Sequence, residues 1–297
     1  MIRSPLRDPR LFQIATLTCL LVYGIADLDF EIRPRVVLAI IATALGVQFV
    51  LAVLCRRPGL ELRSALVSTL SLCLLLRTTS EEVAAAAAAA AIASKFVLRI
   101  RTKHVFNPTA LGLAAVLATA DNAWVSAGQW GTAPLAGLWI AGFGSLVIRR
   151  AHRSDITWAF LACYLVLLFG RSWWLGDPIA IGLHHISSGA FLIFAFFMIS
   201  DPRTTPDTRA GRILFAGIVA ATALTLRFGF YQTNALLWSL LACARLVPLL
   251  DRWLPAERYQ WPSGQPTPRN DSRIDGGTRD ETTDDMGAVL PGLSAAS

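Results

Sequence analysis

The sequence predicts an all-α integral membrane protein with about ten transmembrane helices. Hydrophobic residues make up 54% of the 297 residues and charged residues only 16%, and the mean hydropathy is +0.52. This composition is too apolar for an ordinary soluble domain. Apolar runs recur along the whole chain, separated by short polar segments, so lipid is the expected solvent for most of the surface.

Ten apolar runs approach the roughly 20 residues that a helix needs to cross the hydrocarbon core. They lie at 11–26, 36–54, 64–76, 83–98, 109–125, 132–148, 155–170, 179–199, 213–228 and 233–250. The third run carries Ser64, Ser68 and Ser71, is the shortest of the ten, and is therefore the weakest of the predicted spans. Five spans in each half would insert with opposite orientations, which predicts two inverted five-helix repeats.

Basic residues alternate along the predicted loops. The segments that we expect on the cytoplasmic side carry Arg3, Arg7 and Arg10; Arg56, Arg57 and Arg63; Arg99, Arg101 and Lys103; Arg149, Arg150 and Arg153; and Arg203, Arg209 and Arg212. The other loops pair their arginines with acidic residues, as with Arg77 beside Glu81 and Glu82, and only Arg227 stands alone. The positive-inside rule then predicts both termini in the cytoplasm and a multi-pass protein of the cell (inner) membrane.

Two segments stand apart in composition. Residues 1–252 form the predicted polytopic membrane domain, and residues 253–297 are a polar tail that we expect to be disordered and cytoplasmic. The low-complexity run from Ala84 to Ala91 predicts a helix that packs closely against its neighbours through small side chains.

Several function classes find no support in the sequence. The basic residues that give the net charge of +7 form small groups between apolar runs, so no nucleic-acid partner is expected. The five cysteines are scattered singly and predict neither a disulfide framework nor a zinc site. There is no P-loop, no GxGxxG and no hydrolase triad.

The first candidate site cluster joins Lys95 to the segment Lys103–Gly112. Asn107 followed by Pro108 predicts a helix start, with Asn107 as the cap and Pro108 just inside. Such a start leaves backbone N–H groups that can face an anion or a carbonyl. A plain cytoplasmic turn is the alternative.

The second candidate cluster runs from His184 to Thr205. His184 and His185 point about 100° apart on a helix, so a metal site made by this pair is not expected. Ser188 and Gly189 would let a flat ligand approach closely, and helix packing by small residues is the alternative. Asp201-Pro202 repeats the Asn107-Pro108 pattern, which predicts a second helix start, and Thr204 follows it.

At these residues the chain resembles the RnfD/NqrB family, which comprises the RnfD membrane subunit of Rnf-type electron-transport complexes and the NqrB subunit of the sodium-translocating NADH:quinone reductase. The resemblance is carried by Lys95 with the segment Phe106–Gly112, and by Ser188-Gly189-Ala190 with Phe196–Thr205, and it continues through Gly211–Gly217 to Val247–Asp251. It covers residues 90 to 255. It implies a fold similar to urea transporters, a flavin on an electron path across the membrane, and partner subunits that are membrane-bound or extracytoplasmic.

Family members attach FMN to a threonine in an outward loop. The corresponding stretch here, Thr119–Gly131, has no Ala-Thr acceptor, so covalent FMN is not expected. The truncated loop resembles short relatives of the UnbU type from enediyne biosynthesis. The resemblance therefore implies a non-covalent flavin (FMN or riboflavin) or a quinone, held near Lys95, Asn107, Pro108, Ser188, Gly189, Asp201, Pro202 and Thr204.

Two other interpretations of the sequence stay open. The broken helices also suit a transporter or channel for a small solute, and the missing flavin loop also suits a redox-inert assembly subunit. Whether the chain is part of an oxidoreductase is left open, because the sequence contains no complete set of recognisable catalytic residues.

Overall fold

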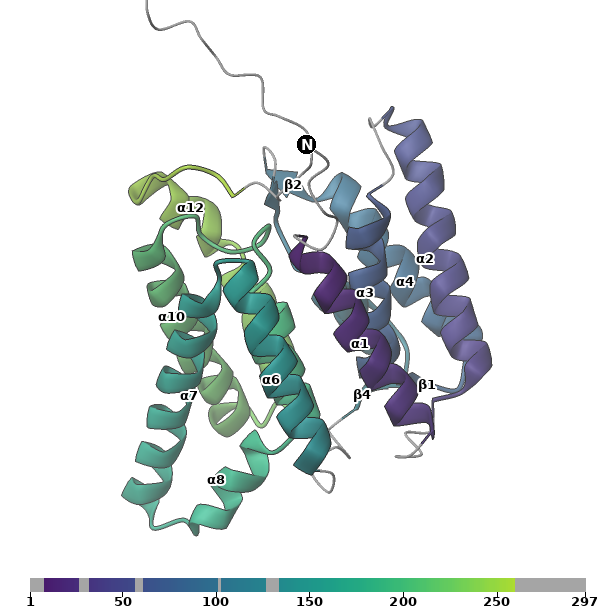
Figure 1. Cartoon of the computed structure of the whole chain (residues 1–297). Helices are drawn as coiled ribbons and strands as arrows, with labels where there is room; N and C mark the ends of the chain where they lie inside the picture. The colour runs from purple at the N-terminus through teal and green to yellow at the C-terminus, as the bar shows by residue number, and fades with distance from the viewer. Residues whose placement is uncertain (1–7, 27–31, 57–60, 101–102, 127–133, 260–297) are drawn as a thin grey trace, which may run out of the picture. The chain divides into compact units, whose positions relative to one another are not determined.

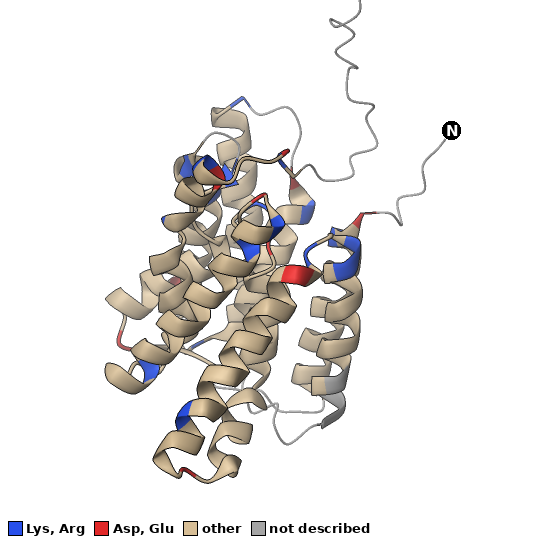
Figure 2. Ribbon diagram, turned by 90° about the vertical axis from the view of Figure 1, so that its left-hand side faces the viewer, with Lys and Arg blue, Asp and Glu red and all other residues tan. Residues whose placement is uncertain are grey.

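Helices dominate the computed structural model (Figure 1). The structure describes residues 8–26, 32–56, 61–100, 103–126 and 134–259. Arg3, Arg7, Arg57 and Arg101, and the predicted tail from residue 260 onward, lie outside the described residues. In Figure 2 the charged residues gather mostly toward the ends of the helices, with uncharged stretches between them.

The described residues of the first half form five helices and four short strands. These are α1 (Pro9–Ala26), α2 (Pro34–Leu54), α3 (Leu62–Leu75), β1 (Leu76–Thr78), α4 (Glu81–Val97), β2 (Arg99–Ile100), β3 (Lys103–His104), α5 (Pro108–Thr119) and β4 (Ala123–Val125). Helix α4 packs between α2 and α5, and α1 packs on α3. Strand β1 pairs antiparallel with β4, and β2 pairs antiparallel with β3.

The second half repeats this order of packing partners. Its elements are α6 (Pro134–Arg150), α7 (Ser154–Leu175), α8 (Ile179–Ile186), α9 (Gly189–Ile193), the π-helix η3 (Phe194–Met198), α10 (Arg209–Gly229), α11 (Ala235–Cys243) and α12 (Leu246–Trp253). Helix α10 packs between α7 and α11 as α4 does between α2 and α5, and α6 packs on α9 and η3 as α1 does on α3. The halves meet where α1 contacts α6 and α5 contacts α11.

The chain is an α-helical, multi-pass membrane protein. Within the described residues, 4 helices are long and apolar enough to cross a membrane, namely α1, α2, α7 and α10, and α8 with α9 and η3 makes up to 5 if its 57° bend lies within one span. The remaining helices are shorter. The count of ten spans and the topology therefore stay predictions.

The last residues of two predicted spans, 64–76 and 109–125, lie in strands rather than in helix. Helix α3 stops at Leu75, and α5 stops at Thr119 before β4 begins at Ala123. The two extended segments pair with each other, Leu76 opposite Val125 and Thr78 opposite Ala123. This pairing supplies the backbone hydrogen bonds that a helix would otherwise provide, which is why extended chain is tolerated there.

The sequence predicts Arg77 on an outward loop beside Glu81 and Glu82, but the structure places it on β1. The side chain is buried, and Nη1 donates to the carbonyl oxygen of Leu76 at 2.9 Å. The guanidinium therefore donates hydrogen bonds to backbone carbonyl groups at and just after the end of α3.

Side-chain caps fix where several helices begin. Asn107 accepts a hydrogen bond from the N–H of Ala110 at 3.1 Å, with Pro108 in the first turn, so the predicted helix start is confirmed. The second predicted start, at Asp201-Pro202, is wrong. These residues lie in a turn, and α10 begins only at Arg209, where the Thr208 hydroxyl accepts from the N–H of Gly211 at 3.1 Å and serves as the cap.

The alanine run packs closely, as predicted. Ala84, Ala87, Ala88 and Ala91 on α4 are completely buried. A Cβ placed on Gly112 of α5 would lie 2.5 Å from the carbonyl oxygen of Ala87. The small side chains therefore let the two backbones touch.

Candidate functional site

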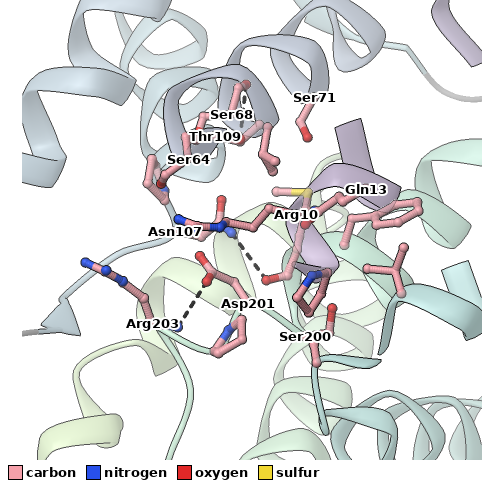
Figure 3. A pocket seen from close by; sticks show the side chains of 18 of the residues that line it. Arg10, Gln13, Ser64, Ser68, Ser71, Asn107, Thr109, Ser200, Asp201 and Arg203 are labelled. Atoms are coloured by element: carbon pink, nitrogen blue, oxygen red, sulfur yellow. Dashed lines mark hydrogen bonds between the residues drawn. The ribbon is translucent and has the colours of Figure 1, made fainter. Parts of the chain in front are cut away.

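The structure brings polar side chains together in a small chamber, here called the polar chamber, between the first turns of α1, α3 and α5, the end of α6 and the turn after η3. Figure 3 shows these side chains converging from separate elements. The space among them is about 50 Å³. The polar residues that line it are Arg10, Gln13, Ser64, Ser68, Ser71, His104, Asn107, Thr109, Ser200, Asp201 and Arg203.

The three serines of α3 line the chamber because their spacing places them on one helix face. The Ser68 hydroxyl donates to the carbonyl oxygen of Ser64 at 3.2 Å. The Thr109 hydroxyl donates across to the carbonyl oxygen of Ser68 at 3.4 Å. The three serines of this run therefore form a hydroxylated wall of the chamber rather than a lipid-facing surface.

Lys95 and Asn107 tie the chamber to neighbouring helices. Lys95, in the last turn of α4, is buried and donates from Nζ to the carbonyl oxygen of Ser64 at 2.7 Å. The Asn107 amide donates from Nδ2 to the carbonyl oxygen of Met198 at 3.3 Å. The start of α5 is thereby joined to the end of η3, a separation of 91 residues along the chain.

Asp201 closes the chamber on the opposite side. Its carboxylate accepts the N–H of Arg203 at 3.0 Å, and its carbonyl oxygen accepts the Thr204 and Thr205 hydroxyls at 3.3 and 2.9 Å. Burial raises the pKa of the Asp201 carboxyl, and the Arg203 N–H with the charges of Lys95, Arg203 and Arg153 only partly offsets that rise.

An ion cluster stands at the edge of the chamber. The Asp8 carboxylate receives Arg10 Nη2 and Arg63 Nη1, each at 2.7 Å. Burial alone would raise the pKa of Asp8, but the hydrogen bonds from Arg10 and Arg63 outweigh it and leave the pKa below the usual value. Asp8 therefore stays ionised and joins the start of α1 to α3.

We expect the free energy of unfolding of Asp8→Asn to depend less on pH in the acid range than that of the native protein. Because the folded pKa lies below the unfolded value of about 3.9, the carboxylate stabilises the fold above that value, and this stability is lost as the pH falls through the folded pKa. At neutral pH the variant should lose about 1–3 kcal/mol. Thermal unfolding in detergent across the acid range measures both effects, with Asp177→Asn in the more exposed Arg171 pair as control. An unchanged pH profile in Asp8→Asn would contradict the assignment.

A second, larger cavity lies elsewhere, and we call it the aromatic pocket. Its volume is about 490 Å³, and it is lined by aromatic, cationic and hydroxyl or amide side chains from both halves. Its lining includes Trp124, Phe191 and Phe194; His184, His185 and Arg227; Ser126, Ser188, Thr233 and Asn234; and Leu75, Leu113 and Met198. None of the described residues that line it is Asp or Glu.

Arg227 and His185 form the polar corner of this pocket. Arg227 Nη2 lies 2.7 Å from His185 Nδ1. A guanidinium can only donate, so Nδ1 accepts and the proton of the neutral imidazole must be on Nε2. Within the described part of the chain no protein group accepts from Nε2, which leaves one N–H donor beside the guanidinium.

Residues 121–260 match the NQR2, RnfD, RnfE family. The match covers just under half of the chain, so over these residues the chain is similar to that family. The D subunit of the ion-translocating oxidoreductase complex from Psychromonas ingrahamii is 31% identical over 141 residues, which is 39% of this chain and 40% of that relative. The protein of the same name from Escherichia coli O81 is 31% identical over 123 residues, 41% of this chain and 34% of the relative. In Tolumonas auensis the identity is 38% over 73 residues, 24% and 21% of the two chains. The chain thus matches less than half the length of these relatives.

The family match places the predicted site residues unevenly. Ser188, Gly189, Asp201, Pro202 and Thr204 fall inside the matched region, whereas Lys95, Asn107 and Pro108 precede it.

The structure also divides these residues between two places. Asn107, Pro108, Asp201 and Pro202 line the polar chamber, and Lys95 reaches it through Ser64. Thr204 lies directly behind Asp201. Ser188 lines the aromatic pocket instead, where its hydroxyl caps α9, and Gly189 is buried behind it.

The eight residues therefore do not surround one ligand. A space of about 50 Å³ holds water or a small ion but not a flavin ring. Sequence reasoning placed His185 and Phe191 in the second candidate cluster without giving them a binding role, and it missed Trp124 and Arg227. The one available signal was Arg227, the only arginine of the predicted outward loops without an acidic neighbour.

Proposed function

We propose that the chain is the membrane subunit of an electron-transport complex of the Rnf/Nqr type, and that it holds a flavin (FMN or riboflavin) or a quinone non-covalently in the aromatic pocket. The observation that carries this proposal is the pocket itself. Its volume of about 490 Å³ falls in the range of about 300–1,000 Å³ that is usual for small-molecule sites. The relatives of the family belong to ion-translocating oxidoreductase complexes, which supports other membrane or extracytoplasmic electron-transfer subunits as partners.

The lining residues fit a planar ring with carbonyl groups. Trp124, Phe191 and Phe194 offer faces and edges for stacking. Arg227 and the Nε2–H of His185 can donate to ring carbonyl oxygens. The bound ring would supply the electron-transfer chemistry, while these side chains bind it, orient it and exclude water.

The ten-span topology belongs to this proposal. The repeated order of helix packing supports two inverted repeats, with α12 as an additional short helix. In this proposal the chain lies in the cell (inner) membrane with both termini in the cytoplasm. The polar chamber then lies on the cytoplasmic side of the membrane and the aromatic pocket on the outer side.

A titration of Trp fluorescence tests the pocket assignment. Riboflavin, FMN and a soluble short-chain quinone are each added to the full chain in detergent, and quenching gives Kd. We expect Ala190→Phe, which fills the pocket, to raise Kd at least tenfold, a change of about 1.4 kcal/mol. Ser71→Ala in the polar chamber serves as the control and should leave Kd unchanged. Equal binding in both variants, or binding of none of the three probes, would overturn the pocket assignment.

A solute path is the second candidate, because the cavities adjoin one another. Met198 lines both the polar chamber and the aromatic pocket, and His104 lines both the chamber and a cleft at the other end. This interpretation predicts solute flux in proteoliposomes without a redox partner, abolished by Asp201→Ala. A redox-inert assembly protein, as in enediyne biosynthesis, instead predicts neither flux nor bound flavin or quinone.

A further inference from the structure

His104 is a buried histidine on β3 that the aromatic pocket does not use. It is only 6% exposed, and neither Nδ1 nor Nε2 has a hydrogen-bond partner of proper geometry among the residues that the structure describes. A neutral imidazole carries one donor and one acceptor, and each polar group left unmet in a buried site costs about 1–3 kcal/mol. We therefore expect water to bind both nitrogens.

His104 borders two cavities, from which water can reach the two nitrogens once the ring moves. His104 is among the residues that line the polar chamber, and it also lines a cleft of about 750 Å³, here called the charged cleft, beside β3 and α12. The chamber volume of about 50 Å³ holds a few waters, since one water needs about 10–15 Å³ measured this way. His104 thus forms part of the wall between an open cleft and a closed chamber.

Asp201 lines the chamber together with His104, surrounded by cationic groups from several elements. Among the described residues, the charged and titratable groups around the chamber are Arg10 on α1, Lys95 on α4, Arg99 on β2, Arg153 before α7, Arg203 in the same turn as Asp201, Tyr259 after α12, and His104 itself. Arg10 and Arg203 are held by Asp8 and Glu61. Lys95 is bound to Ser64 and makes no ion pair with the Asp201 carboxylate in the described structure. The carboxylate therefore keeps capacity for a proton or for water.

On the cleft side, which also carries Arg252 and Arg258, Lys103 is held by two carboxylates. Lys103 Nζ lies 2.8 Å from Asp207 and 2.6 Å from Asp251, and it donates to the carbonyl oxygen of Thr205 at 2.9 Å. This triad fixes β3, and so the backbone of His104, against the turn that follows Asp201. The geometry keeps the imidazole between the two cavities.

We infer that Asp201 is a proton-binding site, reached from the charged cleft through His104. A hydronium ion in the cleft gives a proton to the unprotonated ring nitrogen of His104 and becomes water. The opposite nitrogen releases its proton to a water in the chamber, and the hydronium formed there passes it to the Asp201 carboxylate. No electron moves and no covalent bond other than N–H and O–H changes. The imidazole ends as the other tautomer and returns by rotation.

The pKa values agree with this division of roles. Burial, with the charges of Lys95, Arg203 and Arg99, lowers the pKa of His104 to about 3, and the nearby Lys95 backbone offsets this only in part. His104 is therefore neutral except during transfer. Burial raises the pKa of Asp201, so this carboxyl keeps a proton at a higher pH than an exposed aspartate would.

Infrared spectroscopy of the full chain in detergent tests the inference. A protonated carboxyl gives a C=O band that is separate from the amide bands, and Asp201→Asn identifies which part belongs to Asp201. We expect this band to decline as pH rises from about 4 to about 8, with a midpoint above the usual aspartate value of about 3.9. Transfer into D₂O then gives the rate of proton exchange at Asp201.

We expect His104→Phe, which keeps a ring in the wall but removes both nitrogens, to slow this exchange at least tenfold. His104→Gln can still bind water but cannot carry a proton, so it should slow exchange as well, and it replaces the Phe variant if that protein does not fold. His152→Gln, at an exposed histidine that lines neither the chamber, the cleft nor the aromatic pocket, is the matched control and should leave the rate unchanged. Exchange as fast in both His104 variants as in the native protein, or no band lost in Asp201→Asn at any pH, would overturn the inference. Neither result depends on a bound flavin or quinone.

Discussion

Asp155→Ala is expected to destabilise the protein by about 3–5 kcal/mol, because it leaves the largely buried guanidinium of Arg212 without its partner. Arg212 Nε lies 3.0 and 2.9 Å from the two carboxylate oxygens of Asp155, and Nη1 donates to the carbonyl oxygen of Asp207 at 2.6 Å. The side chains are only 10% and 15% exposed. This contact joins the first turns of α7 and α10, the closest helix pair of the second half.

Chemical unfolding in detergent measures the loss. The double variant Asp155→Asn with Arg212→Gln should recover much of it, since no unpaired charge remains. Asp177→Ala removes the partner of Arg171 at a more exposed site, 38% and 31% exposed, and should cost no more than about 1 kcal/mol. If Asp155→Ala cost as little as Asp177→Ala, the buried contact would not hold α7 to α10.

Gly112→Ala is the second change with a large expected effect. The new Cβ would lie 2.5 Å from the carbonyl oxygen of Ala87 and 2.8 Å from the Cβ of Ala91. Backbone cannot move aside as a flexible side chain can, so α5 must shift away from α4 at a cost of about 1–3 kcal/mol or more. The shift would also move Asn107 away from Met198 and loosen the polar chamber.

Gly46→Ala on α2 is the matched control, because its Cβ would meet nothing within 4 Å. That substitution should be neutral or stabilise by up to about 1 kcal/mol through helix propensity. Thermal unfolding midpoints of both variants in the same detergent make the comparison. A midpoint for Gly112→Ala at or above that of Gly46→Ala would contradict the close packing of α4 on α5.

Hydropathy and capping residues predict much of the fold. The apolar runs locate the helices, Asn107-Pro108 marks the start of α5, and the alanine run marks the tightest helix contact. Hydropathy does not distinguish an apolar helix from an apolar strand, so it does not reveal the change to β1 at Leu76 and to β4 at Ala123. The prediction at Asp201-Pro202 is wrong because this carboxylate caps the turn, whereas Thr208 caps the next helix.

The candidate site could be predicted only in part, for a physical reason. The chamber residues Asn107 and Asp201 stand in motifs that the family resemblance brings together. The aromatic pocket is assembled from several separate segments, each giving a few ordinary side chains, such as Trp124 from β4 and Arg227 from α10. Only tertiary packing brings these residues together, so their spacing along the sequence does not predict the pocket.

The most direct test of the proposed electron-transport role is the absorbance spectrum of the detergent-purified full chain, taken before and after acid precipitation and dithionite reduction. The proposal predicts a flavin that appears in the acid supernatant and is bleached by dithionite, or a quinone extracted into organic solvent from the same sample. A colourless protein from which neither is recovered, and which binds neither when they are added, would contradict it.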